Sequence, residues 1–96
     1  MIDPGLLEFD WDKGNIGKNK KHHVEDYESE EVFFDEGKVI LKDVLHSQNE
    51  ERFIILGMTK RERLLFVAFC KRSSRLRIIS ARDAHKKERK LYEKTT

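Results

Sequence analysis

Arginine, lysine and histidine are the side chains of this chain that could do chemistry. The cationic ones crowd the strand-rich and C-terminal parts of the sequence: Arg52, Arg63, Arg75, Arg77, Arg82, Arg89, Lys86, Lys87 and Lys90. A guanidinium group binds phosphate through two parallel hydrogen bonds, so several on one sheet would hold an RNA or DNA backbone. Trp11, with Tyr27 or Tyr92, could stack on a base, and a histidine that titrates near neutrality could move a proton.

Together these groups could cleave RNA without a metal. A base would take the 2′-hydroxyl proton, the oxygen would attack the adjacent phosphorus, and an acid would protonate the leaving oxygen while arginines stabilise the added charge. Each residue also has a plain structural reading, with the arginines as a solvated face and Trp11 and Tyr92 as the rim of a core. From the residues alone, a generic binding module therefore remains an alternative to an RNA-cleaving enzyme.

Motifs of other site types are absent from the sequence. It has no glycine-rich phosphate loop, no Cys-x-x-Cys and no His-Glu-x-x-His pair, so we expect no cofactor and no metal site. On a helix, the adjacent His22 and His23 would point about 100° apart and could not share a metal. Cys70 ends the most apolar stretch, and we expect it to be a buried small hydrophobe rather than a nucleophile.

The charge separates along the chain although the net charge is only +2. Residues 25–51 hold ten acidic and two basic side chains, whereas residues 71–96 hold ten basic and three acidic ones. This pattern could offer a basic face to a polyanion, or the opposite blocks could pair across the fold. The length of 96 residues fits one small domain covering residues 1–96.

The elements that must position these residues follow from hydrophobic periodicity and turn signals. Residues 6–11 could form a short edge strand, and helices are expected over residues 13–22 and 25–34. Strands are then expected over residues 38–44, 52–58, 63–70 and 75–81, with a closing helix over residues 82–94. In the last strand, alternation puts Arg75, Arg77 and Ile79 on one face and Leu76, Ile78 and Ser80 on the other. The expected class is α+β: two N-terminal helices, a four-stranded antiparallel sheet and a C-terminal helix.

Membrane and secretory signals are missing. The longest apolar run, residues 64–70, is far shorter than the roughly 20 residues that span a bilayer. The first residues do not combine a basic region with an apolar run, and a single cysteine permits no internal disulfide. We therefore expect a cytoplasmic protein without a membrane partner.

The chain resembles the BrnT-type ribonuclease toxins of bacterial and archaeal toxin–antitoxin pairs. The resemblance is carried by an ordered set of short matches along nearly the whole chain: Phe9-Asp10-Trp11-Asp12, Asn19, Lys21-His22, Val32-Phe33, Glu51-Arg52, Gly57, Arg63-Leu64-Leu65, Arg77-Ile78-Ile79-Ser80-Ala81-Arg82, Ala84, Glu88-Arg89 and Tyr92. The ordered set is far more specific than any one of its pieces.

The resemblance implies a RelE-like fold and a metal-independent endoribonuclease that inhibits translation. It also implies a cognate BrnA-like antitoxin that binds and neutralises the toxin in a hetero-oligomer. The toxin would contact operator DNA only through this antitoxin, and the complex would repress the operon. The alternative is a non-catalytic subunit that binds nucleic acid or the antitoxin.

Carried over residue by residue, the resemblance suggests two groups of site residues. The catalytic residues would be His22, His23, Arg63 and Arg82, with one histidine as acid or base and the arginines on the scissile phosphate. The RNA-binding residues would be Trp11, Arg52, Arg77, Ser80 and Tyr92.

Two departures from the family pattern bear on these roles. Counting from Trp11 favours His23 as the family histidine, whereas counting back from Val32 favours His22, so both stay open. Glu62 stands where a glycine often precedes Arg63. Its carboxylate could supply a base or neutralise the site, although a salt bridge in the turn is the simpler reading.

Overall fold

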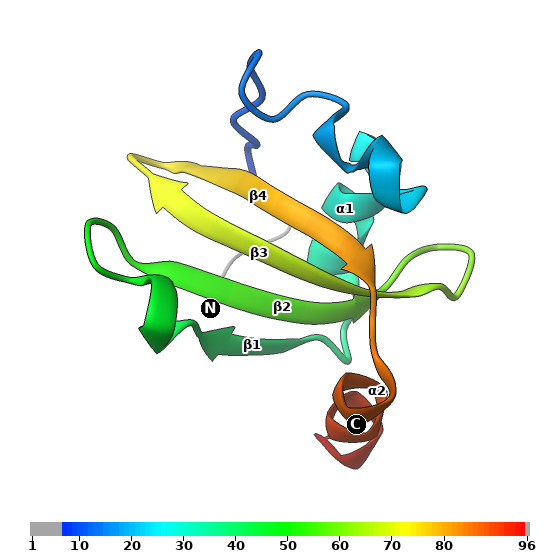
Figure 1. Ribbon diagram of the computed structural model, residues 1–96. Helices are drawn as coiled ribbons and strands as arrows, with labels where there is room; N and C mark the ends of the chain where they lie inside the picture. The colour runs from blue at the N-terminus through cyan, green and yellow to red at the C-terminus, as the bar shows by residue number, and fades with distance from the viewer. Residues whose placement is uncertain (1–6, 96) are drawn as a thin grey trace.

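The structure, a computed structural model that describes residues 7–95, is built on one four-stranded antiparallel sheet (Figure 1). The strands lie side by side in chain order: β1 (Val39–Lys42), β2 (Arg52–Met58), β3 (Leu64–Arg72) and β4 (Arg75–Asp83). Helix α1 (Asp26–Glu31) lies behind the sheet in Figure 1, and α2 (Lys86–Thr95) follows β4 at one end of it. The expected α+β class, antiparallel sheet and C-terminal helix are confirmed.

The helix expected over residues 13–22 is wrong, so two N-terminal helices are not present in the described chain. Residues 13–17 form turns, and only η2 (Lys18–His22), a 3-10 helix, follows. Side chains take the place of helical bonds: Asp12 Oδ1 accepts from the Gly14 N–H (2.8 Å), and Asn15 Oδ1 accepts from the Asp12 N–H (2.8 Å). Gly17 then adopts a φ of 67°, which a right-handed helix does not allow.

The second expected helix is shorter than residues 25–34. A capping box between Glu25 and Glu28 starts α1, and the chain tightens into a 3-10 turn, η3 (Val32–Phe34), before the sheet. The strand expected over residues 52–58 is confirmed as β2. The closing helix begins four residues later than expected because Arg82 and Asp83 extend β4.

Two apolar clusters lie on opposite faces of the sheet. The larger one joins η3 to strands β2, β3 and β4, with Val32, Phe33, Ile55 and Val67 fully or almost fully buried. Gly57 allows η3 to approach β2, because a Cβ at this position would lie 2.8 Å from the Val32 carbonyl oxygen. The smaller cluster joins Leu56 and Leu64 of the sheet to Tyr92 of α2, and leaves much of this second face open.

A bulge in β4 changes which residues share a face. Phe69 of β3 pairs with Ile78, but the preceding Ala68 pairs with Ser80, so Ile79 is an extra residue. The strict alternation expected for β4 is therefore wrong beyond Ile78. Ser80 joins Arg82 on the open face of the sheet.

The outer edge of β4 is covered by the N-terminal segment. Phe9 forms a parallel bridge with Leu76, which is the described part of the strand expected over residues 6–11; Leu6 lies outside the described residues. Asn15 donates to the Ile78 carbonyl (3.1 Å), and Asn19 Oδ1 accepts from the Ala81 N–H (3.0 Å). These side chains satisfy edge groups of β4 and fix η2 beside it.

Candidate functional site

Arg63 ties three parts of the chain together just before β3. Its Nε donates to Asp83 Oδ1 (2.6 Å) and its Nη2 to Asp83 Oδ2 (3.2 Å), which is a bidentate pair at the end of β4. Its Nη1 donates to Glu28 Oε1 of α1 (3.2 Å) and to the His23 carbonyl (2.7 Å), and Nη2 also reaches the His22 carbonyl (3.4 Å). An arginine guanidinium has five N–H donors, and all three of its nitrogen atoms donate to protein acceptors here.

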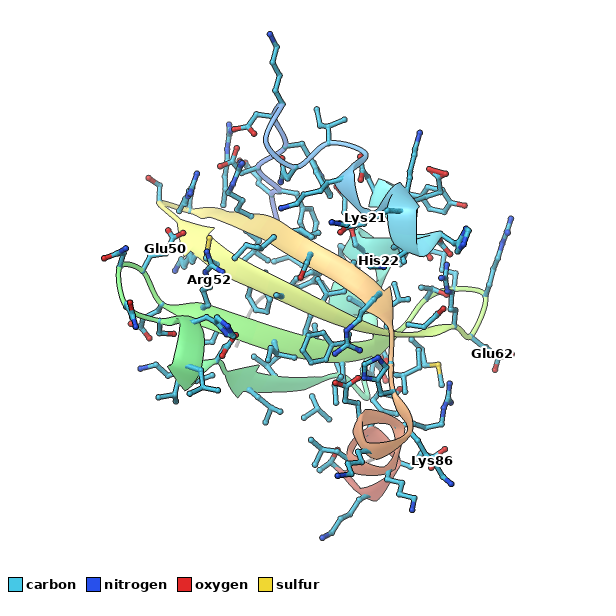
Figure 2. All side chains as sticks on the ribbon, in the orientation of Figure 1. Lys21, His22, Glu50, Arg52, Glu62 and Lys86 are labelled. Carbon is cyan, nitrogen blue, oxygen red and sulfur yellow. The ribbon has the colours of Figure 1, made fainter. Side chains whose placement is uncertain are left out.

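The backbone of the two histidines is therefore held in place while their side chains stay exposed. η2 ends at His22, and His23 turns the chain with a φ of 60°. Figure 2 shows Lys21 and His22 beside β4, toward the end at which that strand finishes. The backbone of this turn is held by hydrogen bonds, and both imidazole rings are exposed to solvent.

Asp83 supplies negative charge next to this turn. The hydrogen bond from Arg63 lowers the pKa of Asp83, and the positive charges of His23 and Arg89 lower it further. The same bond raises the pKa of Arg63. Asp83 therefore stays ionised, and an imidazolium that forms at His23 lies in the field of a carboxylate.

Arg82 lies on the open face of the sheet, across from Phe66 of β3. Its guanidinium carbon is 3.9 Å from the centre of the Phe66 ring, and its two Nη atoms donate to Glu88 Oε1 (2.8 Å) and Oε2 (2.9 Å). These hydrogen bonds lower the pKa of Glu88. Arg82 thus has a fixed orientation while its side chain keeps 29% of its surface exposed.

Three other expected RNA-binding residues are engaged in packing. Trp11 lies against the larger apolar cluster and donates from Nε1 to Glu30 Oε2 (2.6 Å). Arg77 is only 12% exposed and donates through both Nη atoms to Asp12. Tyr92 is buried, and its hydroxyl donates to Asp35 Oδ2 (2.6 Å).

Arg52 lies at the opposite end of the sheet from Arg63. It begins β2 and pairs with Cys70 near the end of β3, and it lines a hollow of about 530 Å³. Figure 2 shows Arg52 and Glu50 together at this end, away from His22 and Lys86. The structure thus brings His22, His23, Arg63 and Arg82 to one end of the sheet and places Arg52 at the other.

The sequence did not predict that the carboxylates of Glu28 and Asp83 belong to the site. The Glu25-x-x-Glu28 spacing is a weak signal for a helix start, and Asp83 stands next to Arg82 without a motif of its own. Only the β3–β4 pairing brings Asp83 to the start of β3, where Arg63 stands. Glu62, whose carboxylate could have taken this role, is exposed and turns the chain with a φ of 62°.

Cys70 is buried, as expected, and burial raises the pKa of its thiol. Among residues 7–95, no group of three His, Cys, Asp or Glu side chains is arranged to hold a metal ion. Nor does that part of the chain contain a helix with the length and apolar character needed to cross a bilayer.

Fold and site define a small α+β protein that presents two histidines and an arginine at one end of an antiparallel sheet. The family model described as ribonuclease toxin, BrnT, of type II toxin–antitoxin system matches residues 11–88. The chain therefore belongs to the BrnT family of ribonuclease toxins. A search among curated proteins found no further match.

Proposed function

We propose that the chain is an endoribonuclease toxin that cleaves RNA without a metal. One of His22 and His23 transfers the proton, and Arg82 binds the scissile phosphate with Ser80 beside it. The observation that carries the proposal is the exposed two-histidine turn, which Arg63 fixes through both carbonyl oxygens next to Asp83. Membership of a ribonuclease toxin family supports the same reaction class.

In the proposed step the histidine acts first as a base. It takes the 2′-hydroxyl proton, the 2′-oxygen bonds to phosphorus, and the bond from phosphorus to the 5′-oxygen breaks. A protonated group returns a proton to that 5′-oxygen, which leaves a 2′,3′-cyclic phosphate and a 5′-hydroxyl. Arg82 stabilises the extra negative charge on phosphorus, and Asp83 stabilises the imidazolium if His23 is the base.

Arg63 has a different part in this proposal from the one that the resemblance implies. Its fork is engaged by Asp83, Glu28 and the two histidine carbonyls, so binding a phosphate would require it to break bonds that hold the turn. We assign Arg63 as a positioning residue that orients the histidines. We keep Arg82 as the phosphate-binding group, because a phosphate could replace Glu88 at its two Nη atoms without breaking a bond that holds the histidine turn.

The family also implies an antitoxin as partner. In our proposal this antitoxin is BrnA-like and neutralises the toxin in a hetero-oligomer. Only the antitoxin of this complex contacts operator DNA, and the complex represses the operon. The free toxin inhibits translation by cutting RNA. We propose a RelE-like architecture for the fold, supported by the antiparallel order β1-β2-β3-β4 with helices packed against it.

The test is cleavage of a single-stranded RNA by the purified chain in the presence of EDTA. We expect products with a 2′,3′-cyclic phosphate and a 5′-hydroxyl, detected by mass spectrometry. His22→Ala and His23→Ala, made separately, identify the proton-transfer group, and His85→Ala is the matched histidine control. Full activity in both variants, or activity that requires a divalent metal, would overturn the mechanism.

A second candidate is a non-catalytic subunit that binds RNA. The specific observation in its favour is that carboxylates engage Arg63, Arg77 and Arg82 at 2.6–2.9 Å. This candidate predicts salt-dependent RNA binding with no cleavage over hours, and no growth arrest when the protein is expressed.

A further inference from the structure

Arg52 differs from the other arginines on the strands. Arg72, Arg75, Arg77 and Arg82 each have a carboxylate partner, at distances from 2.8 to 3.5 Å. Arg52 is partly buried, yet its guanidinium forms no ion pair or side-chain hydrogen bond with another residue in the described range 7–95. Glu50 is close enough for its charge to interact with that of Arg52, but it pairs directly with Arg72. A partly buried guanidinium whose N–H donors have no carboxylate in hydrogen-bond contact can bind the negative charge of a ligand.

The hollow beside Arg52 has the size and lining of a binding site for a small polar group. Its volume of about 530 Å³ falls in the range of roughly 300–1,000 Å³ that is usual for ligand pockets. Arg72, Glu50, Gln48, Asn49 and His46 share its wall with Arg52. The two arginines outnumber the one carboxylate, and Arg72 holds that carboxylate at 3.5 Å.

The chemistry of this wall fits a nucleotide better than a bare anion. Arg52 offers a fork to a phosphate, and the amides of Gln48 and Asn49 can each donate to and accept from the edge of a base. The His46 ring, held by Asp43 at 2.8 Å, and the exposed Leu45 add flat and apolar surface.

The open face of the sheet connects this hollow with the histidine end. Arg82 pairs with Phe66, and Arg52 pairs with Cys70 four residues farther along β3. At about 3.3 Å per residue this separation is about 13 Å, a span of a few nucleotides. Ala68, Ser80 and Ile54 lie between them on this face and are partly exposed.

We propose that this hollow is a second RNA subsite, which binds a nucleotide flanking the cleaved bond. Arg52 holds its phosphate, and Gln48 and Asn49 contact its base. The proposal rests on the proposed function, since it takes RNA as the ligand and the histidine turn as the place of cleavage.

The experiment measures binding apart from cleavage. A fluorescently labelled single-stranded oligoribonucleotide with 2′-O-methyl groups cannot supply the attacking hydroxyl, so its anisotropy reports affinity alone. We expect Arg52→Gln to weaken binding about tenfold. The slope of log affinity against log salt should fall by about 0.7, the value for one lost phosphate contact on a single strand.

Lys71→Gln is the matched control. It removes the same charge at the same end of the sheet, but Lys71 pairs with Leu76 and so belongs to the helix-covered face. Asn49→Ala, which leaves the charge unchanged, should weaken binding without changing the salt slope. It also keeps the proposal testable if Arg52→Gln does not fold.

Unchanged affinity in both Arg52→Gln and Asn49→Ala would overturn the subsite. Equal losses in Arg52→Gln and Lys71→Gln would also overturn it, because they would show attraction by charge alone. Failure of the proposed function looks different: the wild-type chain would then leave unmodified RNA intact, whatever the binding data show.

Discussion

Arg63 illustrates how a side chain can serve a site through the backbone of its neighbours. Its guanidinium contacts the carbonyl oxygens of His22 and His23 rather than their rings. Arg63 therefore fixes the backbone from which the two imidazole rings project, and the rings themselves remain accessible to a substrate. A lysine in its place would keep the charge but could not hold Asp83, Glu28 and the turn together.

We expect Arg63→Lys to lower the rate of RNA cleavage about 100-fold, the usual effect of a small misplacement of a catalytic group. The measurement is single-turnover cleavage with saturating protein, combined with NMR spectra of the backbone amides. A positioning role predicts that the NMR signals of the His22 and His23 backbone amides shift together with the loss of rate, because Arg63 holds these residues through their carbonyl oxygens. Arg61→Lys, at an exposed arginine in the adjacent turn, is the control and should change neither.

Glu62 has a strained backbone conformation. Its φ of 62° lies in the left-handed region, which favours glycine over residues with a Cβ. We expect Glu62→Gly to raise the free energy of unfolding by about 0.5–1 kcal/mol, since relief of this strain exceeds the added chain entropy. Urea denaturation measures the change, and Arg61→Gly, at a position outside that region, should not stabilise the protein.

At the scale of elements, α2 is joined to the rest of the fold through Tyr92. The ring packs with Leu56 and Leu64, and the hydroxyl donates to Asp35 Oδ2, which also accepts from the Met58 N–H (2.8 Å). Asp35 thus links α2 with β2 and with the turn before β1. This explains why a residue expected to bind RNA is buried: its hydroxyl is used to attach the helix.

We expect Tyr92→Phe to lower the free energy of unfolding by about 1–2 kcal/mol, because the Asp35 carboxylate loses a buried donor. The ring and its packing stay in place, so RNA cleavage should be nearly unchanged. Leu91→Ala, at a more exposed neighbour on the same helix, is the stability control. A large loss of activity in a well-folded Tyr92→Phe would instead support a direct contact with RNA.

The strands could be predicted from the sequence because β-branched and aromatic residues mark them and turn residues separate them. The β2 strand was predicted to its end residues, and the buried Cys70 followed from the apolar run around it. The helix expected over residues 13–22 failed because Asp12 and Asn15 bind backbone groups with their side chains, a competition that a hydrophobic pattern does not record.

The site could be predicted less completely than the fold. Residue types led to the prediction of His22, His23, Arg63 and Arg82, which lie at one end of the sheet. Asp83, however, meets Arg63 only through strand pairing, across twenty residues of sequence. The bulge after Ile78, which turns Ser80 to the open face, leaves no mark in the alternation of β4. Contacts of this kind depend on register, which one sequence specifies only through the whole sheet.

At the scale of the molecule, ion pairs connect distant parts of the chain. Arg72 of the basic block meets Glu50 of the acidic block, Arg77 meets Asp12 near the N-terminus, and Arg63 meets Glu28. These contacts support the reading in which opposite charges pair. Many arginines form such ion pairs, whereas the guanidinium of Arg52, at one end of the open face, forms none within residues 7–95.

These pairs make stability depend on pH. The hydrogen bonds from Arg63 and Arg82 lower the pKa values of Asp83 and Glu88. For Asp35, burial alone would raise the pKa, but hydrogen bonds from Tyr92, Met58 and Gly37 outweigh it and the pKa falls. A carboxylate with a lower pKa in the folded state stabilises that state above its unfolded pKa, near 4, and loses this contribution as the pH falls further.

Tyr92 makes the stability of the fold decrease at alkaline pH. Burial and the Asp35 carboxylate raise its pKa to about 12, so its neutral hydroxyl stabilises the fold fully below its unfolded pKa of about 10 and progressively less up to pH 12. We therefore expect the urea midpoint to be flat between about pH 5 and 9 and to fall on both sides. Asp83→Asn should reduce the acid limb only, whereas Tyr92→Phe should remove the alkaline limb and also reduce the acid limb, because the Tyr92 hydroxyl helps to lower the pKa of Asp35. Urea titrations of the three proteins from pH 2 to 12 measure this, and an acid limb that Asp83→Asn leaves unchanged would show that the Arg63 pair does not contribute to the stability of the folded toxin.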